Sequence, residues 1–366
     1  MKTCVPITTI RSVISLATAA VLATLVIALS VRPTRAQSAA QEQHSAAPTA
    51  SDYAAAQEAT RVYRHARAAN TKAAASLKGK EIATRSETPK RSASPDSTAA
   101  TSSSGLRYIG DLSYFGGKVV DTAQSHAIYM LPNGVCPIAT CWGNPEGFLH
   151  DLGQSDLIDV VDQYVGLFSR NRYTLGAHAR INFTPSKTPL TDHDIVVRAH
   201  IEASRLGSGY GHIYHFFLPK GQDICFTATD GICYSPDNPD TFVFCGYHGS
   251  VDFQDIGHVL YSVEPFQNVA GCNVKPGTPN GQLVDSTNNT LSHELIETIT
   301  DPDGDAWFNF MSIPLAGQEI ADECSFFVFV PPSSFYFDPS PFTANGHRYA
   351  VQPEYSNLAH ACTIGR

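Results

Sequence analysis

Residues 285–302 read DSTNNTLSHELIETITDP, and this stretch indicates both the architecture and the chemistry of the chain. Asp285 or Ser286 can cap a helix, and the apolar residues that follow recur at the spacing of one helical face. The residue before Pro302 is disfavoured in a helix, so the helix should end near that point.

A metal-binding pattern, HExxE, lies inside this predicted helix. His293 and Glu297 are four residues apart, so they lie one turn apart on the same face and can bind one metal ion together. An imidazole nitrogen and a carboxylate oxygen are both common zinc ligands. Glu294 is turned about 100° away, the place of the general base in the related HExxH helix. The alternative is an ordinary solvated acidic face.

Further ligands are expected from other parts of the chain. Glu319 and Asp322 are three residues apart, so they can face the same way on one turn and supply a third ligand. Asp301 is the nearer alternative. His248 is an additional candidate because it lies where a predicted strand ends, although a histidine on a strand is more often structural.

Calcium is the alternative to zinc, because residues 301–305 read DPDGD. An EF-hand loop that starts at Asp301 would need glycine at its sixth place and glutamate at its twelfth. The chain has Ala306 and Ser312 there. An irregular calcium site or a simple turn that ends the helix would also account for this sequence.

Predicted strands and helices alternate before this helix. Strands are expected at 118–131, 173–183, 212–218, 241–248 and 258–263, and helices at 156–168 and 191–206. Thr191 and Asp194 have the spacing of a capping box at the start of the second helix. Residues 326–366 are proline-rich and should be extended. This order predicts an α+β or α/β fold in which a mixed sheet packs on helices.

The N-terminus has the features of a secretory signal peptide over residues 1–36. Lys2 and Arg11 precede an apolar run at 13–31, and small residues follow at a cleavage spacing. We therefore expect an exported protein, secreted or held in a periplasm or at a cell surface, with no stable membrane insertion after cleavage. An uncleaved anchor is the alternative.

Residues 37–104 are rich in Ala, Ser and Thr and poor in large apolar residues, which predicts a flexible linker or a pro-segment. The alanine-rich part at 52–80 could be helical, and Tyr53 and Tyr63 are expected at the surface. Residues 105–366 are expected to form a single globular domain.

The net charge of the expected domain excludes one class of partner. Residues 105–366 hold 12 Lys or Arg against 28 Asp or Glu. Nucleic-acid binding depends on basic side chains that neutralise phosphates, so no nucleic-acid partner is expected. The acidic charge suits cations, a basic partner, or solubility alone.

Eight cysteines remain after the signal peptide, which in an oxidising compartment predicts up to four disulfides. The sequence does not fix their pairing, but short loops make Cys136–Cys141 and Cys225–Cys233 the simplest local pairs. Cys245–Cys272 and Cys324–Cys362 would then remain. Zinc binding by thiolates is the alternative, although no pair of CxxC motifs is present.

Four short stretches, in this order, together resemble the phosphate-induced protein family, also called the EXORDIUM family. They read YFGGKV, CGYHGS, EIADEC and GHRYAVQ, at residues 114–119, 245–250, 319–324 and 346–352. The resemblance covers most of residues 108–366. It implies an extracellular protein, and plant members are linked to growth and the cell wall without an established reaction.

Plant members carry small and apolar residues where His293, Glu294 and Glu297 stand. Microbial relatives are closer, with a His-Glu-Leu helix followed by Thr-Asp-Pro, as at Thr300 to Pro302. That branch is similar to zincin metallopeptidases. The resemblance implies a secreted zinc-dependent hydrolase that acts on peptides or cell-wall material. The alternative is a non-catalytic extracellular signalling protein with a structural ion or none.

Overall fold

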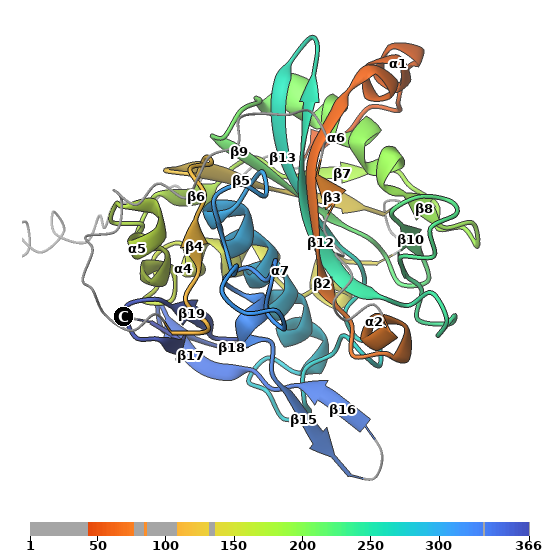
Figure 1. The fold of residues 1–366 in the computed structure, drawn as a ribbon. Coiled ribbons are helices and arrows are strands. Elements are labelled where there is room, and N and C mark those ends of the chain that lie inside the picture. Colours follow the sequence, from red (N-terminus) through yellow and green to blue (C-terminus); the bar gives the residue numbers. More distant parts are fainter. Residues whose placement is uncertain (1–42, 77–83, 86–107, 132–135, 332–333, 366) are drawn as a thin grey trace, which may run out of the picture. The chain divides into compact units, whose positions relative to one another are not determined.

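A computed structural model describes residues 43–76, 84–85, 108–131, 136–331 and 334–365 (Figure 1). The described residues belong to one compact unit. The predicted signal peptide lies outside them. No helix in the described part of the chain is both long enough and apolar enough to cross a membrane.

A nine-stranded mixed sheet is the centre of this unit. Its strands, in spatial order, are β1 (Gln43–His44), β7 (Ala179–Ile181), β5 (Ala123–Met130), β9 (His212–Phe217), β13 (Gly257–Glu264), β12 (Phe244–Phe253), β2 (Thr60–Ala68) and β3 (Thr84–Arg85), and β6 (Tyr173–Leu175) also pairs with β5. Neighbouring strands from β1 to β13 run parallel, whereas β12 is antiparallel to both β13 and β2. Each strand predicted before the HExxE helix overlaps one of these strands.

Helices cover both faces of the sheet. The helices α1 (Ala50–Glu58) and α6 (Asp192–Leu206) share one apolar core with it, and α4 (Pro145–Leu152), η1 (Ile158–Val161), α5 (Asp162–Val165) and α7 (Gln282–Thr300) share the other. Strand β9 shows the alternation, because Tyr214 and Phe216 lie in the first core and Ile213 and Phe217 in the second. The expected mixed sheet packed on helices is therefore confirmed.

Local sequence signals place the start of α6 and the end of α7, but α7 begins at Gln282 with Gly281 as its N-cap, so the expected cap at Asp285 or Ser286 is wrong. The Thr191 amide donates to Asp194 Oδ2 at 2.7 Å, which completes the predicted capping box of α6. Helix α7 ends at Thr300, and Asp301 caps it directly before Pro302. Nearly the whole length of α7 is buried, so its many Ser, Thr and Asn side chains lie inside the unit.

Short elements complete the fold. They are α2 (Lys72–Ser76), β4 (Ser113–Tyr114), α3 (Ile138–Cys141), β8 (Leu190–Thr191), β10 (Ile224–Cys225), β11 (Cys233–Tyr234), β14 (Trp307–Phe308), η2 (Asp322–Cys324), β15 (Phe327–Val330), β16 (Ser334–Phe337), β17 (Ser340–Ala344), β18 (His347–Val351), β19 (Glu354–Ser356) and β20 (Ala361–Thr363). The last six strands form three antiparallel hairpins, which agrees with the predicted extended tail.

Four disulfides join the eight cysteines in the described residues. The pairs are Cys136–Cys141, Cys225–Cys233, Cys245–Cys272 and Cys324–Cys362. The two local pairs expected from short loops are confirmed, and so is the pairing of the other four cysteines. Such a set is typical of proteins from an oxidising compartment.

We expect no reactive thiol among these eight cysteines in the denatured, unreduced protein. Cys245 and Cys272 have no exposed surface, so replacing both with serine should lower the free energy of unfolding by about 2–5 kcal/mol. Thiol counting and denaturant unfolding measure the two effects. Two or more reactive thiols would contradict the pairing.

Strand β2 corrects the expectation for residues 37–104. Residues 60–68 are not a flexible linker, because they pair with β12 from Ala68↔Phe244 to Thr60↔Asp252. Tyr63, expected at the surface, is 5% exposed. The alanine-rich region forms α1 and α2 rather than one helix, with β2 between them. A pro-segment, the other expectation for residues 37–104, can pack against a folded unit in this way.

Strand β2 packs into the sheet because ion pairs and hydrogen bonds stabilise it as well as apolar contacts. On the face towards α6, Arg61 and Arg64 pair with the buried carboxylate of Asp192. On the face towards α7, Arg67 donates to Thr290 and lies over the ring of Phe337. A strand that buries arginines against partners far along the chain leaves little apolar signal in its own sequence.

Candidate metal centre

Helix α7 carries the predicted HExxE residues, and all three are fully buried. His293 Nε2 lies 3.1 Å from Glu297 Oε2, as the one-turn spacing predicted. The other ring nitrogen, Nδ1, lies 3.1 Å from Gln352 Oε1 and can donate to it. A hydrogen bond of this kind fixes the ring of a metal-binding histidine and leaves Nε2 free for the ion.

The fold brings three more of the predicted residues to the same place. His248 lies on β12, Glu319 lies in the loop before η2, and Asp322 begins η2. His248 Nε2 is 3.7 Å from Glu297 Oε2 and 3.5 Å from Glu319 Oε2. Asp322 Oδ1 is 3.7 Å from His293 Nε2, and the Asp322 amide donates to Glu297 Oε1 at 3.2 Å.

These distances suit a small divalent ion. Zinc binds nitrogen and oxygen ligands at about 2.0–2.2 Å, so two ligands of a tetrahedral site lie roughly 3.4 Å apart. The four separations between donor atoms given above run from 3.1 to 3.7 Å. Glu297 is common to all three groups of possible ligands that the described residues form, but no group contains both His248 and His293. Glu297 is therefore the residue that all the possible ligand groups share.

The donor atoms also lack other partners. His248 Nε2, His293 Nε2, Glu297 Oε2 and Glu319 Oε2 are buried and accept or donate no hydrogen bond within the described residues. A buried polar atom left unpaired costs about 1–3 kcal/mol. Unpaired buried donor atoms gathered around one carboxylate, here Glu297, are typical of a site that binds an ion.

The electrostatics of the cluster favour a cation. Burial raises the pKa of Glu319, and the charges of Asp301 and Glu297 raise it further. Burial raises the pKa of Asp301 to about 8, and burial lowers the pKa of His248 well below its usual value. A divalent cation would stabilise the charged form of these buried carboxylates, and the neutral imidazole that burial favours at His248 is the form that binds a metal ion.

Glu294 points into the same interior but has different neighbours. One of its oxygens belongs to a group with His293 and Glu297 whose ligand atoms lie within 4.8 Å of one another. Burial raises its pKa, the charges of Glu264 and Glu297 add to this, and Arg67 opposes it. Gly246 of β12 gives it room, since a Cβ there would lie 2.7 Å from Glu294 Oε1.

Asp301 borders the cluster, but the rest of the DPDGD loop serves the fold. Asp301 Oδ1 accepts from the Ala306 amide at 2.7 Å, and Oδ2 has no hydrogen-bond partner among the described residues. Asp303 is bound by Ser250, His258 and Tyr210. Protein donors therefore occupy the Asp303 carboxylate that an irregular calcium site would use.

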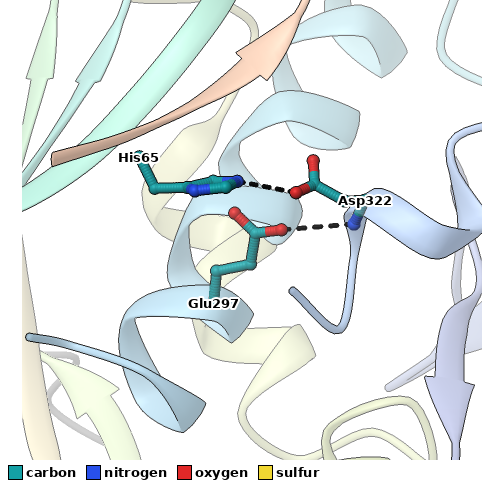
Figure 2. A group of neighbouring side chains, drawn as sticks. All are labelled: His65, Glu297 and Asp322. Atoms are coloured by element: carbon teal, nitrogen blue, oxygen red, sulfur yellow. Dashed lines mark hydrogen bonds and ion pairs between the residues drawn. The ribbon is translucent and has the colours of Figure 1, made fainter. Parts of the chain in front are cut away.

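Sequence reasoning missed two residues of β2, Tyr63 and His65. Tyr63 donates to Glu319 Oε1 at 2.6 Å, and His65 Nε2 lies 2.6 Å from Asp322 Oδ2. Figure 2 shows His65, Glu297 and Asp322 pointing towards one another from β2, α7 and η2. Burial opposes the charged form of His65, but the charge and hydrogen bond of Asp322 and the charge of Glu297 raise its pKa to about 9.

The only signal for these two residues was the alternation of larger polar side chains in TRVYRHARA.

Comparisons with family models, with curated proteins and with solved structures gave no match for this chain. The site is therefore interpreted from its own geometry.

Proposed function

We propose that this chain is an exported zinc-dependent hydrolase of the zincin type, most simply a peptidase. The observation that carries the proposal is the set of buried, unpartnered donor atoms on His248, His293, Glu297 and Glu319, with Asp322 beside them. The predicted resemblance to the microbial branch of the EXORDIUM family supports the same reaction class.

The proposed roles follow from position. His293 and Glu297 would hold the ion, with Glu319 or Asp322 as a further ligand; His248 could join them only after a shift, since no group of possible ligand atoms within 4.8 Å contains both histidines. A bound zinc ion would lower the pKa of a water ligand and polarise the carbonyl to be cleaved. Glu294, adjacent to the ligands, would take a proton from the attacking water and pass it to the leaving amine. The hydroxyl then stays on the carbonyl carbon, so one water is consumed for each bond cleaved.

A second candidate is a non-catalytic extracellular or cell-wall-associated protein with a structural ion. The burial of the donors favours it, because structural zinc sites are closed to water whereas catalytic sites keep one open position. His248, His293, Glu297 and Glu319 each have no exposed surface.

The full chain should hydrolyse members of a broad peptide library when loaded with zinc. Removal of the metal by a chelator should abolish the hydrolysis, and added zinc should restore it, because the proposed nucleophile is a zinc-bound water. The activity is measured as the appearance of new amino termini in the digest. A zinc-loaded protein that cleaves no peptide would make the structural ion the better interpretation.

A further inference from the structure

The carboxylates of Glu319 and Asp322 are each held by one oxygen and left open at the other. Tyr63 Oη bonds Glu319 Oε1, whereas Glu319 Oε2 has no hydrogen-bond partner among the described residues and faces His248 Nε2 at 3.5 Å. His65 Nε2 bonds Asp322 Oδ2, whereas Asp322 Oδ1 faces His293 Nε2 at 3.7 Å. In both cases β2 binds one oxygen and the other is turned to a histidine of the metal centre.

Tyr63 and His65 form a single connected unit. Tyr63 Oη lies 3.1 Å from His65 Nδ1, so a chain of hydrogen bonds runs from Glu319 through both residues to Asp322. The two residues lie on the same face of β2, which the sheet fixes directly beside His248 and Ser250 of β12. Their positions are therefore set by the sheet and not by the loop that they contact.

Glu319 and Asp322 have less support of their own. They lie outside the sheet, in and just before the short helix η2 between β14 and β15, where the chain turns at Gly317 with φ of 82° and the Glu319 amide donates to Asp322 Oδ2 at 3.3 Å. A carboxylate in such a segment has several rotamers, and ordering one of them costs side-chain entropy. Hydrogen bonds from a rigid strand reduce that cost before the ion binds.

His65 fits an orienting role better than the role of a ligand. Its Nε2 atom lies 2.6 Å from Asp322 Oδ2, which is a hydrogen-bond distance. Two ligands of one tetrahedral zinc ion would lie roughly 3.4 Å apart. The imidazole therefore bonds the carboxylate and not the ion that the carboxylate would bind.

We propose that β2 is the orienting shell of the metal centre, with Tyr63 and His65 as positioning residues for the carboxylates of Glu319 and Asp322. The inference rests on the metal site proposed above. It makes the N-terminal segment an integral part of that site.

The test compares zinc affinity, measured by chelator competition, and the visible spectrum of the cobalt-loaded protein. Tyr63→Phe and His65→Ala should each weaken zinc binding about 10–100-fold and change the cobalt spectrum. His65→Gln keeps a donor near the position of Nε2 and should recover part of the affinity lost in His65→Ala. Thermal unfolding of the metal-free proteins verifies that each variant folds.

Two matched controls remove similar groups outside the site. Tyr261→Phe removes a buried hydroxyl that bonds the Asp192 carboxylate, and His200→Ala removes a buried histidine between Asp52 and Asp255. Both should bind zinc like the parent. If the parent binds zinc and the Tyr63 and His65 variants match it within twofold, the orienting role is wrong. A parent that binds no zinc would overturn the proposed metal site as well.

Discussion

Replacement of Glu294 by glutamine should give a protein that folds and keeps its zinc but hydrolyses peptides about 10²–10⁴-fold more slowly. The amide has nearly the shape of the carboxyl group and cannot take a proton from water. Glu294 is one residue from His293 and lies about 100° around α7, so the proposal gives it the proton transfer, although one of its oxygens also lies within 4.8 Å of ligand atoms of His293 and Glu297. Peptide cleavage and zinc content, measured on the same preparation, read the two properties separately.

Glu202→Gln is the matched control for this variant, because Glu202 is equally buried but lies on α6 and pairs with Arg205. It should leave hydrolysis unchanged. A Glu294→Gln protein that loses its zinc would show that Glu294 is a ligand. A Glu294→Gln protein as active as the parent would remove the proposed general base and favour another mechanism.

Loss of either histidine ligand should have the largest effect on metal binding. Structural zinc sites with four ligands bind with about 10–16 kcal/mol, so one ligand is worth about 2.5–4 kcal/mol, or about 10²–10³-fold in affinity. We expect losses of this size in His293→Ala and in His248→Ala, measured by chelator competition. His293→Ala also removes the hydrogen bond between His293 Nδ1 and Gln352 Oε1, so the stability of the metal-free variant should be recorded alongside.

His215→Ala is the control for both histidine variants. His215 is fully buried on β9, next to the strand that pairs with β12, and bonds Ser262. It should bind zinc like the parent. If His248→Ala also keeps the parent affinity, then β12 supplies no ligand and the ion, if bound, is held by α7 and the η2 segment alone.

Much of the architecture could be predicted from local patterns. The capping box of α6 and the proline after α7 each depend on residues a few positions apart, so the sequence displays them directly. The pairing of Cys136 with Cys141 has the same local character. These predictions were confirmed because their physical cause lies within one element or one short loop, whereas the expected cap of α7 at Asp285 or Ser286 was wrong.

Strand β2 shows why the rest could not be predicted. Its arginines are stabilised by Asp192, more than one hundred residues further along the chain, and by groups on α7. The composition of residues 37–104 predicted no folded structure there, because the groups that pair with the buried arginines of β2 belong to other elements. The proposed ligands His293 and Glu297 were visible as a one-turn pair, whereas Tyr63 and His65 join the site only through the β2–β12 register.

Elemental analysis of the full chain, purified without added metal and in the absence of chelators, tests the metal centre most directly. We expect about one zinc ion per chain, retained through gel filtration and absent from His293→Ala. A chain that is folded and metal-free, and that takes up no zinc on titration, would contradict the proposed centre. Stoichiometric calcium that survives His293→Ala would instead place the ion at the loop from Asp301 to Asp305.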